Sequence, residues 1–445
     1  MSIQDASERW GTELKHPGVG FFAAFASRVA GVDGPRDATR EALKVLIPVV
    51  DWKGYLPHVP HGLLGTWAVW VLRPRLSEGS FLRLLATQLH AFAHEVRDAK
   101  GSLGRIGAGS GNWANIGAAI RTHRPSLAWG ECQGIETPTT EDFARVMTMA
   151  APDMANVGHK AVTAWAMGQL FEMLDAPRAT GRRMLGLCAW LAATEPTDFF
   201  WRKRADARLE ECSLRIPAGP AKDMETHGQA LREVCDLGLV DLLDRTCARL
   251  KQEPASGDLL SILARAAAEK QLDARRDLEG KTAWNWVFLA TLAEGLAPSG
   301  DPGTYAQAAA LVNLFPTDEV EDRIRPRAPG APATDLSQAL QDAILDAEAP
   351  EAMFLARKLR ETTGESAVLD ALAEAASRND SAFNHSHQIL SVASASALLP
   401  HLTEAAGTVM LESLAKCLAN SQGSSDLGRM ADRALSGRSA GSGSA

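Results

Sequence analysis

His159-Lys-Ala-Val-Thr-Ala-Trp-Ala166 is one of three segments in which a His opens a run of small and apolar residues. The others are His61-Gly-Leu-Leu-Gly-Thr-Trp-Ala68 and His387-Gln-Ile-Leu-Ser-Val-Ala-Ser394. In an α-helix, the fourth and seventh residues after each His lie on the same face as the imidazole. Those positions hold small residues in every segment: Gly65, Ala68, Thr163, Ala166, Ser391 and Ser394. We therefore expect open space beside each imidazole.

Three such faces turned inward would form a cavity with titratable walls. We expect three catalytic histidines to line it, namely His61, His159 and His387. Four further residues are expected to contact a substrate: Trp67, Trp165, Thr163 and Ser391. The alternative is that the small residues let two helices pack closely and that each His belongs to the core. One segment alone favours this alternative, whereas three together leave the two interpretations evenly balanced.

The composition predicts an all-α fold. Ala, Leu, Arg and Glu dominate the 445 residues, and the alternation typical of strands is almost absent. We expect a multi-helical array around a central cavity, without a regular short repeat. The expected organisation is a helical core over 1–320, a Pro-rich loop or linker over 321–335, and a C-terminal helical segment over 336–420 that completes the core. Residues 421–445 are rich in Gly and Ser and are expected to form a disordered tail.

The net charge, the apolar stretches and the cysteines of the sequence argue against several classes of protein. The net charge of −8 argues against a nucleic-acid-binding surface. The apolar stretch 63–72 is far shorter than the roughly 20 residues that a membrane span needs. The six cysteines include no CxxC pair, and no signal peptide is evident, so we expect a reduced, cytoplasmic protein. The expected partner is a small-molecule substrate, and a protein partner stays open.

Histidines of this kind support two chemistries. Neutral imidazole is a ligand of transition metals, so His61, His159 and His387 could form an open metal site, with iron favoured and with His58 or His385 as substitutes. The same side chains could act as general acids or bases near neutral pH. A second pair, His90 and His94, has the one-turn spacing of a chelate but lacks an adjacent third ligand. The glycine-rich stretch 101–112 has the wrong spacing for a dinucleotide fingerprint and is expected to be a connector.

The order of the His segments resembles the questin oxidase-like family. The similar stretches are 60–68, 158–166 with 189–193 downstream, and 384–391 followed by 397–402. The resemblance extends from about residue 45 to 420, and its specificity comes from the order of short motifs. The chain departs from the family pattern at Thr163, where the family has Arg, and at Ala166, where it has a second His.

The resemblance implies an all-helical oxidoreductase of secondary metabolism. The family's activity is an oxygen- and NADPH-dependent ring cleavage of an anthraquinone, so the implied substrate is a small aromatic or quinone-type natural product. NADPH is implied as a cofactor, although the sequence carries no flavin motif. The departures at Thr163 and Ala166 keep an alternative open, namely a non-catalytic helical binding, accessory or scaffold protein.

Overall fold

The computed structural model is all-α, as the composition predicts, and the residues that it describes contain no β-strand. These residues are 3–18, 20–30, 34–49, 61–97, 103–153, 158–194, 204, 207, 228–252, 256–274, 281–297, 300–314, 324–330, 334–379, 385–423 and 426–439. By its internal contacts the chain divides into two compact units. Unit 1 comprises Met1–Arg73, Glu78–Asp198 and Ser425–Ala445, and unit 2 comprises Pro74–Ser77 and Phe199–Ser424.

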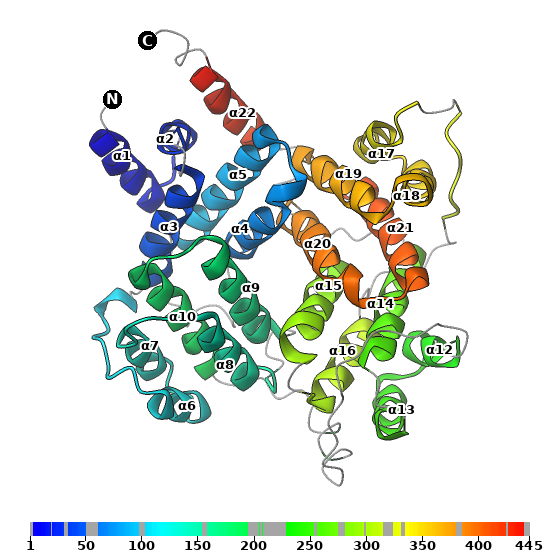
Figure 1. The fold of residues 1–445 in the computed structure, drawn as a ribbon, viewed down its shortest axis with the longest axis horizontal. Coiled ribbons are helices and arrows are strands. Elements are labelled where there is room, and N and C mark those ends of the chain that lie inside the picture. Colours follow the sequence, from blue (N-terminus) through cyan, green and yellow to red (C-terminus); the bar gives the residue numbers. More distant parts are fainter. Residues whose placement is uncertain are drawn as a thin grey trace. The chain divides into compact units, whose positions relative to one another are not determined.

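Unit 1 contains the first two His segments. Its helices are α1 (Ile3–Lys15), α2 (Phe21–Arg28), α3 (Gly34–Leu46), η1 (Ile47–Val49), α4 (His61–Leu72), α5 (Glu78–Arg97), η4 (Leu103–Arg105), α6 (Trp113–Arg121), α7 (Pro125–Gln133), α8 (Thr140–Ala150), α9 (His159–Met173), α10 (Arg178–Ala193) and α22 (Asp426–Ser439). Helix α4 packs against α5 and α9, and α22 returns from the far end of the sequence to pack against α2 and α5 (Figure 1).

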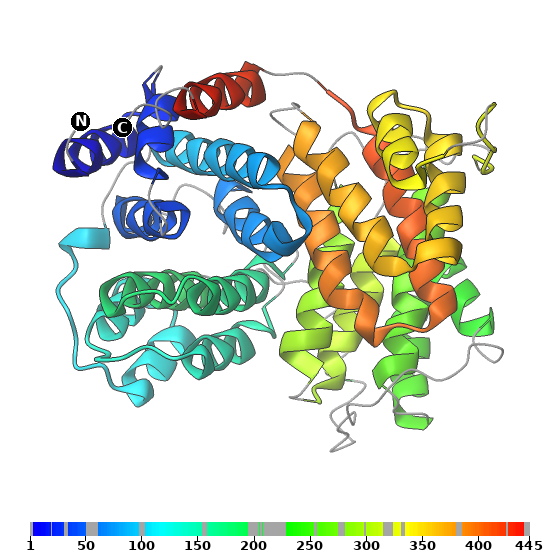
Figure 2. The ribbon, with the colours of Figure 1, turned by 45° about the horizontal axis from the view of Figure 1, so that its top comes forward.

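Unit 2 contains the third His segment. Its helices are α12 (Gly228–Asp236), α13 (Leu239–Gln252), α14 (Ser256–Asp273), α15 (Lys281–Thr291), the π-helix η7 (Leu292–Leu296), α16 (Pro302–Leu314), α17 (Leu336–Leu345), α18 (Ala349–Thr363), α19 (Glu365–Arg378), α20 (His385–Leu398), η9 (Leu399–His401) and α21 (Glu404–Asn420). Helix α20 packs along α15 and also contacts α19 and α21 (Figure 2). The short helix η3 (Arg73–Arg75) lies where the chain passes from unit 1 to unit 2.

The division into units differs from the one that the sequence predicts. The boundary falls between residues 198 and 199, whereas the predicted linker 321–335 lies inside unit 2. Its described part is attached to α18, because the Arg327 amide donates to Pro350 O at 2.9 Å and its guanidinium pairs with Glu348 and Glu351. The predicted disordered tail is wrong over α22, whose Gly428 and Ala431 are buried. Small residues on one helix face allowed this close packing, although the composition resembles that of a disordered segment.

The three His segments are helical, as predicted. Helix α4 begins at His61, α9 begins at His159, and α20 begins at His385 with His387 in its first turn. Gly158, directly before α9, adopts a left-handed conformation (φ 88°), and the helix starts after it. Most residues of α4 and α9 are buried, since apolar residues occur around both helices instead of on one face.

None of the helices that the structure describes is both long and apolar enough to span a membrane.

Candidate functional site

The space expected beside His61 is filled by α5. A Cβ atom on Gly65 would lie 1.9 Å from Gln88 Oε1, and a Cβ on Gly62 would lie 2.3 Å from the backbone nitrogen of Phe92. The two glycines therefore bring the backbones of α4 and α5 together, and the Gln88 side chain occupies the face that was expected to be open. At this helix, the prediction of open space is wrong because a neighbouring side chain supplies the missing volume.

Close packing of α4 on α5 brings a carboxyl to the start of α4. Glu95 Oε1 accepts a hydrogen bond from the His61 amide at 3.2 Å, and Oε2 accepts one from the Gly62 amide at 3.1 Å. Part of Glu95 remains exposed to solvent, but its carboxyl faces protein at α4. Desolvation raises the pKa of Glu95 to about 7, and the two backbone donors only partly oppose this rise. The sequence analysis missed Glu95, because the only local signal was its position beside His94.

Two of the predicted substrate contacts meet each other on α4 and α9. The rings of Trp67 and Trp165 lie 4.8 Å apart between centroids, with their planes at 57°. Trp67 Nε1 donates to Gln169 Oε1 at 2.9 Å. Both indoles are buried, so their described contacts are with the interior of unit 1.

The first turn of α9 is tightly bound to its neighbours. His159 is buried, and the Thr163 hydroxyl donates to His159 O at 2.7 Å. The fully buried Lys160 pairs with Asp153 and donates to Thr194 O at 3.0 Å, at the end of α10. Burial lowers the pKa of Lys160, and the pairing with Asp153 opposes that effect. The hydroxyl proton of Thr163 is therefore already used within its own helix.

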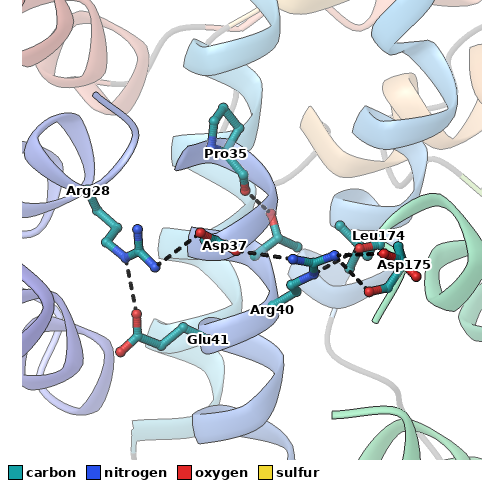
Figure 3. Close-up of polar contacts among 8 residues, drawn as sticks. Arg28, Pro35, Asp37, Arg40, Glu41, Leu174 and Asp175 are labelled. Carbon is teal, nitrogen blue, oxygen red and sulfur yellow. Dashed lines mark hydrogen bonds and ion pairs between the residues drawn. The ribbon is translucent and has the colours of Figure 1, made fainter. Parts of the chain in front are cut away.

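The other end of α9 is held by an arginine from α3. Arg40 Nε donates to Leu174 O at 2.8 Å, and Nη2 donates to Asp175 O at 2.7 Å (Figure 3). Arg28, Asp37 and Glu41 complete this group of charges on α2 and α3. A cation at a helix C-terminus compensates the partial negative charge of the last carbonyls. The charged residues in Figure 3 therefore have a structural role, which is to hold the end of α9 against α3.

Helix α20 is the one His helix whose predicted face retains a buried polar side chain without a hydrogen-bond partner in the part of the chain that the structure describes. The Ser391 hydroxyl donates to His387 O at 2.9 Å, as Thr163 does in α9. Ser394 lies one turn further along the same face, is fully buried, and has no partner for its hydroxyl among the described residues. His387 itself is half-buried. Because an unpaired buried hydroxyl is costly, Ser394 calls for an explanation.

The neighbouring helix α15 carries a comparable group. Trp286 is fully buried, and its Nε1–H has no hydrogen-bond partner among the described residues. Helix α15 continues directly into the π-helix η7, which also contacts α20. Short π-helical turns occur frequently at functional sites. The α15–α20 pair therefore combines a His, an irregular turn, and a hydroxyl and an indole donor that lack a partner among the residues described.

Within the described ranges, the sequence candidates for metal binding form no cluster of ligands. Among the described residues, no group of three or more His, Cys, Asp or Glu side chains could hold a metal ion. His90 packs its ring against Phe22 and Phe21, at centroid distances of 5.2 and 5.0 Å. His58 lies outside the described residues, and His385 begins α20. His61 and His159 belong to unit 1 and His387 to unit 2, so the predicted convergence of the three stays a prediction.

The glycine-rich connector is a structured loop bound to a carboxylate. Glu131 of α7 accepts hydrogen bonds from the Ser110 amide and hydroxyl, the Asn112 amide and the Asn115 side chain. Burial alone would raise the pKa of Glu131, but these donors outweigh it and hold the pKa below its usual value. Gly111 has φ 75°, and a Cβ on Gly134 would lie 2.2 Å from Gly109 O. The glycines are therefore needed for the close approach of loop and helix.

The buried thiols are poor candidates for a nucleophile. Burial raises the pKa of Cys132 and of Cys188, and it raises the pKa of Cys235 to about 11. A thiol reacts as its thiolate, so the raised pKa values argue against a nucleophilic role for these three side chains.

Comparisons with known proteins add no assignment: no family model, curated protein or solved structure matches this chain.

Proposed function

We propose that this protein is an oxidoreductase that binds a small aromatic or quinone-type molecule against the His387 face of α20. The observation that carries the location is Ser394, which is fully buried on that face and lacks a hydrogen-bond partner among the described residues. The class of reaction rests on the resemblance of the three His segments to the questin oxidase-like family. The first two segments support the location less, because Gln88 fills the space beside Gly65 and the Thr163 hydroxyl is bonded within α9.

The chemistry of the unpaired groups fits a carbonyl-bearing ligand. A hydroxyl and an indole N–H are both hydrogen-bond donors, and a quinone oxygen is an acceptor. In the proposed complex, Ser394 and Trp286 donate to the oxygen atoms of the substrate and polarise its ring. His387 transfers a proton to or from the substrate, since imidazole titrates near neutral pH.

Neither implied cofactor has a group of described residues that fits it. The described residues contain no cluster of three metal ligands. They also contain no strand-to-helix turn of the kind that binds a dinucleotide. NADPH and oxygen therefore remain implied by the family resemblance alone. The role of the chain's own residues is to bind and orient the substrate and to move a proton.

The test uses a pair of probes of the same shape. Calorimetry of the full chain should detect binding of 2,3-dimethyl-1,4-naphthoquinone and weaker binding of 2,3-dimethylnaphthalene, which has no oxygen. The methyl groups block addition of the quinone to cysteine thiols. Turnover is followed as NADPH and oxygen consumption with 1,8-dihydroxyanthraquinone.

Two serines on one helix face provide the matched variants. We expect Ser394→Ala to weaken quinone binding about fivefold, the effect of one hydrogen bond of about 1 kcal/mol. Ser391→Ala should change it less than twofold, because the Ser391 hydroxyl already donates to His387 O. His387→Ala should abolish turnover with little loss of binding. Equal affinity for both probes, or equal effects of the two serine variants, would overturn the proposed site.

A second function is favoured by the packing of unit 1. Gly62 and Gly65 serve the contact between α4 and α5, and Trp67 bonds to Gln169, so these residues work as core residues. This use supports a non-catalytic binding, accessory or scaffold protein. Quinone binding without consumption of NADPH and oxygen would support an accessory or carrier role. Absence of quinone binding, with lower melting temperatures for the His variants, would support a scaffold.

A further inference from the structure

A surface of unit 1 combines arginines with apolar side chains from two helices. Helices α6 and α8 both pack against α10 (Figure 1), and their side chains meet beside Gly117. Trp113, Gly117 and Arg121 follow one another at intervals of four residues, so they lie along one face of α6. Arg145 and Met149 have the same spacing on α8. We call these five residues the α6–α8 patch.

The two arginines of the patch are positioned by its apolar residues. The Arg145 guanidinium lies over the Trp113 ring, 5.3 Å from its centroid. A Cβ on Gly117 would lie 3.3 Å from Arg121 Nη1 and 3.9 Å from Met149 Sδ. Because Gly117 has no side chain, Arg121 can fold back along α6 towards the preceding turn. The geometry thus brings a cation from each helix to the same face of α6.

The carboxylates around the patch leave this positive charge uncompensated. Asp142 is the one carboxylate within 4.0 Å of Arg145 among the described residues, and its Oδ2 accepts from the Thr139 amide and hydroxyl at 2.8 and 3.0 Å. Glu141, one turn before Arg145 on α8, is exposed and forms no ion pair with it. Arg121 has no carboxylate partner in the described part of the chain. Both guanidiniums can therefore accept a carboxylate from outside.

Exposure leaves the patch accessible. The Arg145 side chain is 54% exposed, and Arg121 is also exposed. Stacking on Trp113 covers one face of the Arg145 guanidinium, but its N–H donors lie in the plane of the group and can still bind a carboxylate. Trp113 and Met149 are half-buried and present apolar surface beside the cations. Trp, Met and Arg are residue types that are enriched in protein–protein interfaces.

We propose that the α6–α8 patch is a docking surface for an acidic segment of a partner protein. Carboxylates of that segment pair with Arg121 and Arg145, and a neighbouring apolar side chain packs on Trp113 and Met149. The net charge of −8 does not prevent docking, because salt screens charges beyond about 8 Å and the segment meets the local pair of cations. A nucleic acid fits less well, since its phosphates require a longer row of cations than two.

The experiment uses a random copolymer of glutamate and tyrosine, which presents carboxylates beside apolar rings in every local order. Fluorescence polarisation of the labelled copolymer with the full chain should show saturable binding that weakens at high salt. Polyglutamate should bind more weakly because it lacks the rings, and oligothymidylate should bind more weakly still. In the copolymer complex, amide hydrogen exchange followed by mass spectrometry should slow in α6 and α8. Absence of saturable binding, tighter binding of oligothymidylate, or slowing confined to other helices would overturn the proposal.

Exposed arginines provide matched variants. Arg121→Gln and Arg145→Gln should each weaken copolymer binding about two- to fivefold, the effect of one exposed ion pair. Arg429→Gln removes the same charge from α22, also in unit 1, and should leave the affinity unchanged. Met149→Gln should weaken binding of the copolymer but not of polyglutamate, because it removes an apolar contact and no charge. Equal effects of the three arginine variants would indicate non-specific attraction and would rule out a docking surface at the patch.

Discussion

Glycines at equivalent helix positions have opposite roles in this protein. Gly62 and Gly79 are each the second residue of a helix, α4 and α5 respectively. A Cβ on Gly62 would lie 2.3 Å from the Phe92 nitrogen and 2.7 Å from Gln88 O, whereas a Cβ on Gly79 would meet nothing within 4 Å. The first glycine is required by packing, and the second lowers the stability of its helix because of its conformational freedom.

We therefore predict opposite signs for the two alanine variants. Gly62→Ala should lower the free energy of unfolding by about 1–3 kcal/mol, because backbone atoms of α5 must shift. Gly79→Ala should raise it by up to about 1 kcal/mol, the helix-propensity difference. Thermal unfolding followed by circular dichroism measures both. Equal destabilisation by the two variants would contradict the close approach of α4 and α5.

A second prediction at this scale concerns Glu131 and acid. Its pKa lies below the ordinary value, so the folded chain releases this proton more readily than the unfolded chain does. The stabilisation is therefore present above the ordinary pKa of about 4.5 and is lost as the pH falls below it. Glu131→Gln should lower stability by about 1 kcal/mol at pH 7 and by less at pH 3. Denaturant unfolding at both pH values checks this, and a difference that grows in acid would refute it.

Cations from neighbouring helices occupy several helix C-termini. Arg40 does so for α9, Lys160 for α10 and Lys270 for α16, where its ammonium donates to Val312 O at 3.0 Å. Lys416 of α21 is the most complete case. Its buried ammonium donates to Gln271 O, Leu272 O and Ala274 O, at 2.8, 2.7 and 2.6 Å. Each donor compensates carbonyls that have no partner within their own helix.

Lys416→Met should consequently weaken unit 2. The variant keeps the length of the side chain but leaves three carbonyls at the end of α14 without their donor, which we expect to cost about 2–4 kcal/mol. Lys358→Met is the matched control on an exposed helix face, where the i, i+3 pair with Glu361 contributes little. Hydrogen exchange in the last turn of α14 should accelerate in the first variant only. Unchanged exchange there would show that the cap is dispensable.

Helix α22 gives unit 1 a discontinuous sequence. It follows the whole of unit 2 along the chain yet packs against α2 and α5, with Ala431 buried and an Arg83–Asp432 ion pair of 3.6 Å at its edge. Exposed ion pairs add little to stability, so the apolar contact should supply most of the attachment.

Removal of residues 426–445 should therefore act on unit 1 alone. We expect faster hydrogen exchange in α2 and α5 and unchanged exchange in α17–α21 of unit 2, measured by mass spectrometry. Arg429→Ala, on the exposed side of α22, is the control and should leave exchange in α2 and α5 unchanged. Faster exchange in α17–α21 after truncation would contradict the division into units.

Local sequence patterns predicted the helices well. The sequence predicts a helix at each of the three His segments, and the structure has them at α4, α9 and α20. Helix bounds are set locally: Gly158 adopts a left-handed conformation before α9, and α12 ends before Gly238, after which α13 begins. Apolar periodicity identifies a helix, but a single backbone angle decides where it begins.

The candidate site was less predictable, because it depends on which side chains fill the space beside each small residue. Gly65, Thr163 and Ser394 are all small, and the sequence treats them alike. In the structure Gln88 fills the space beside Gly65, Thr163 bonds to its own helix, and Ser394 is buried with no partner in the described part of the chain. These outcomes are set by residues far away in the chain or by side-chain rotamers.

The sequence by itself determined the helical class, the His at the start of three helices and the buried character of those helices, because these follow from local propensity and apolar periodicity. Tertiary structure alone decided the division into units, the docking of α22, the raised pKa of Glu95 and the separate roles of the small residues. Each of these depends on contacts between segments that are distant along the chain. Such contacts follow from complementary shape and desolvation, which no local pattern contains.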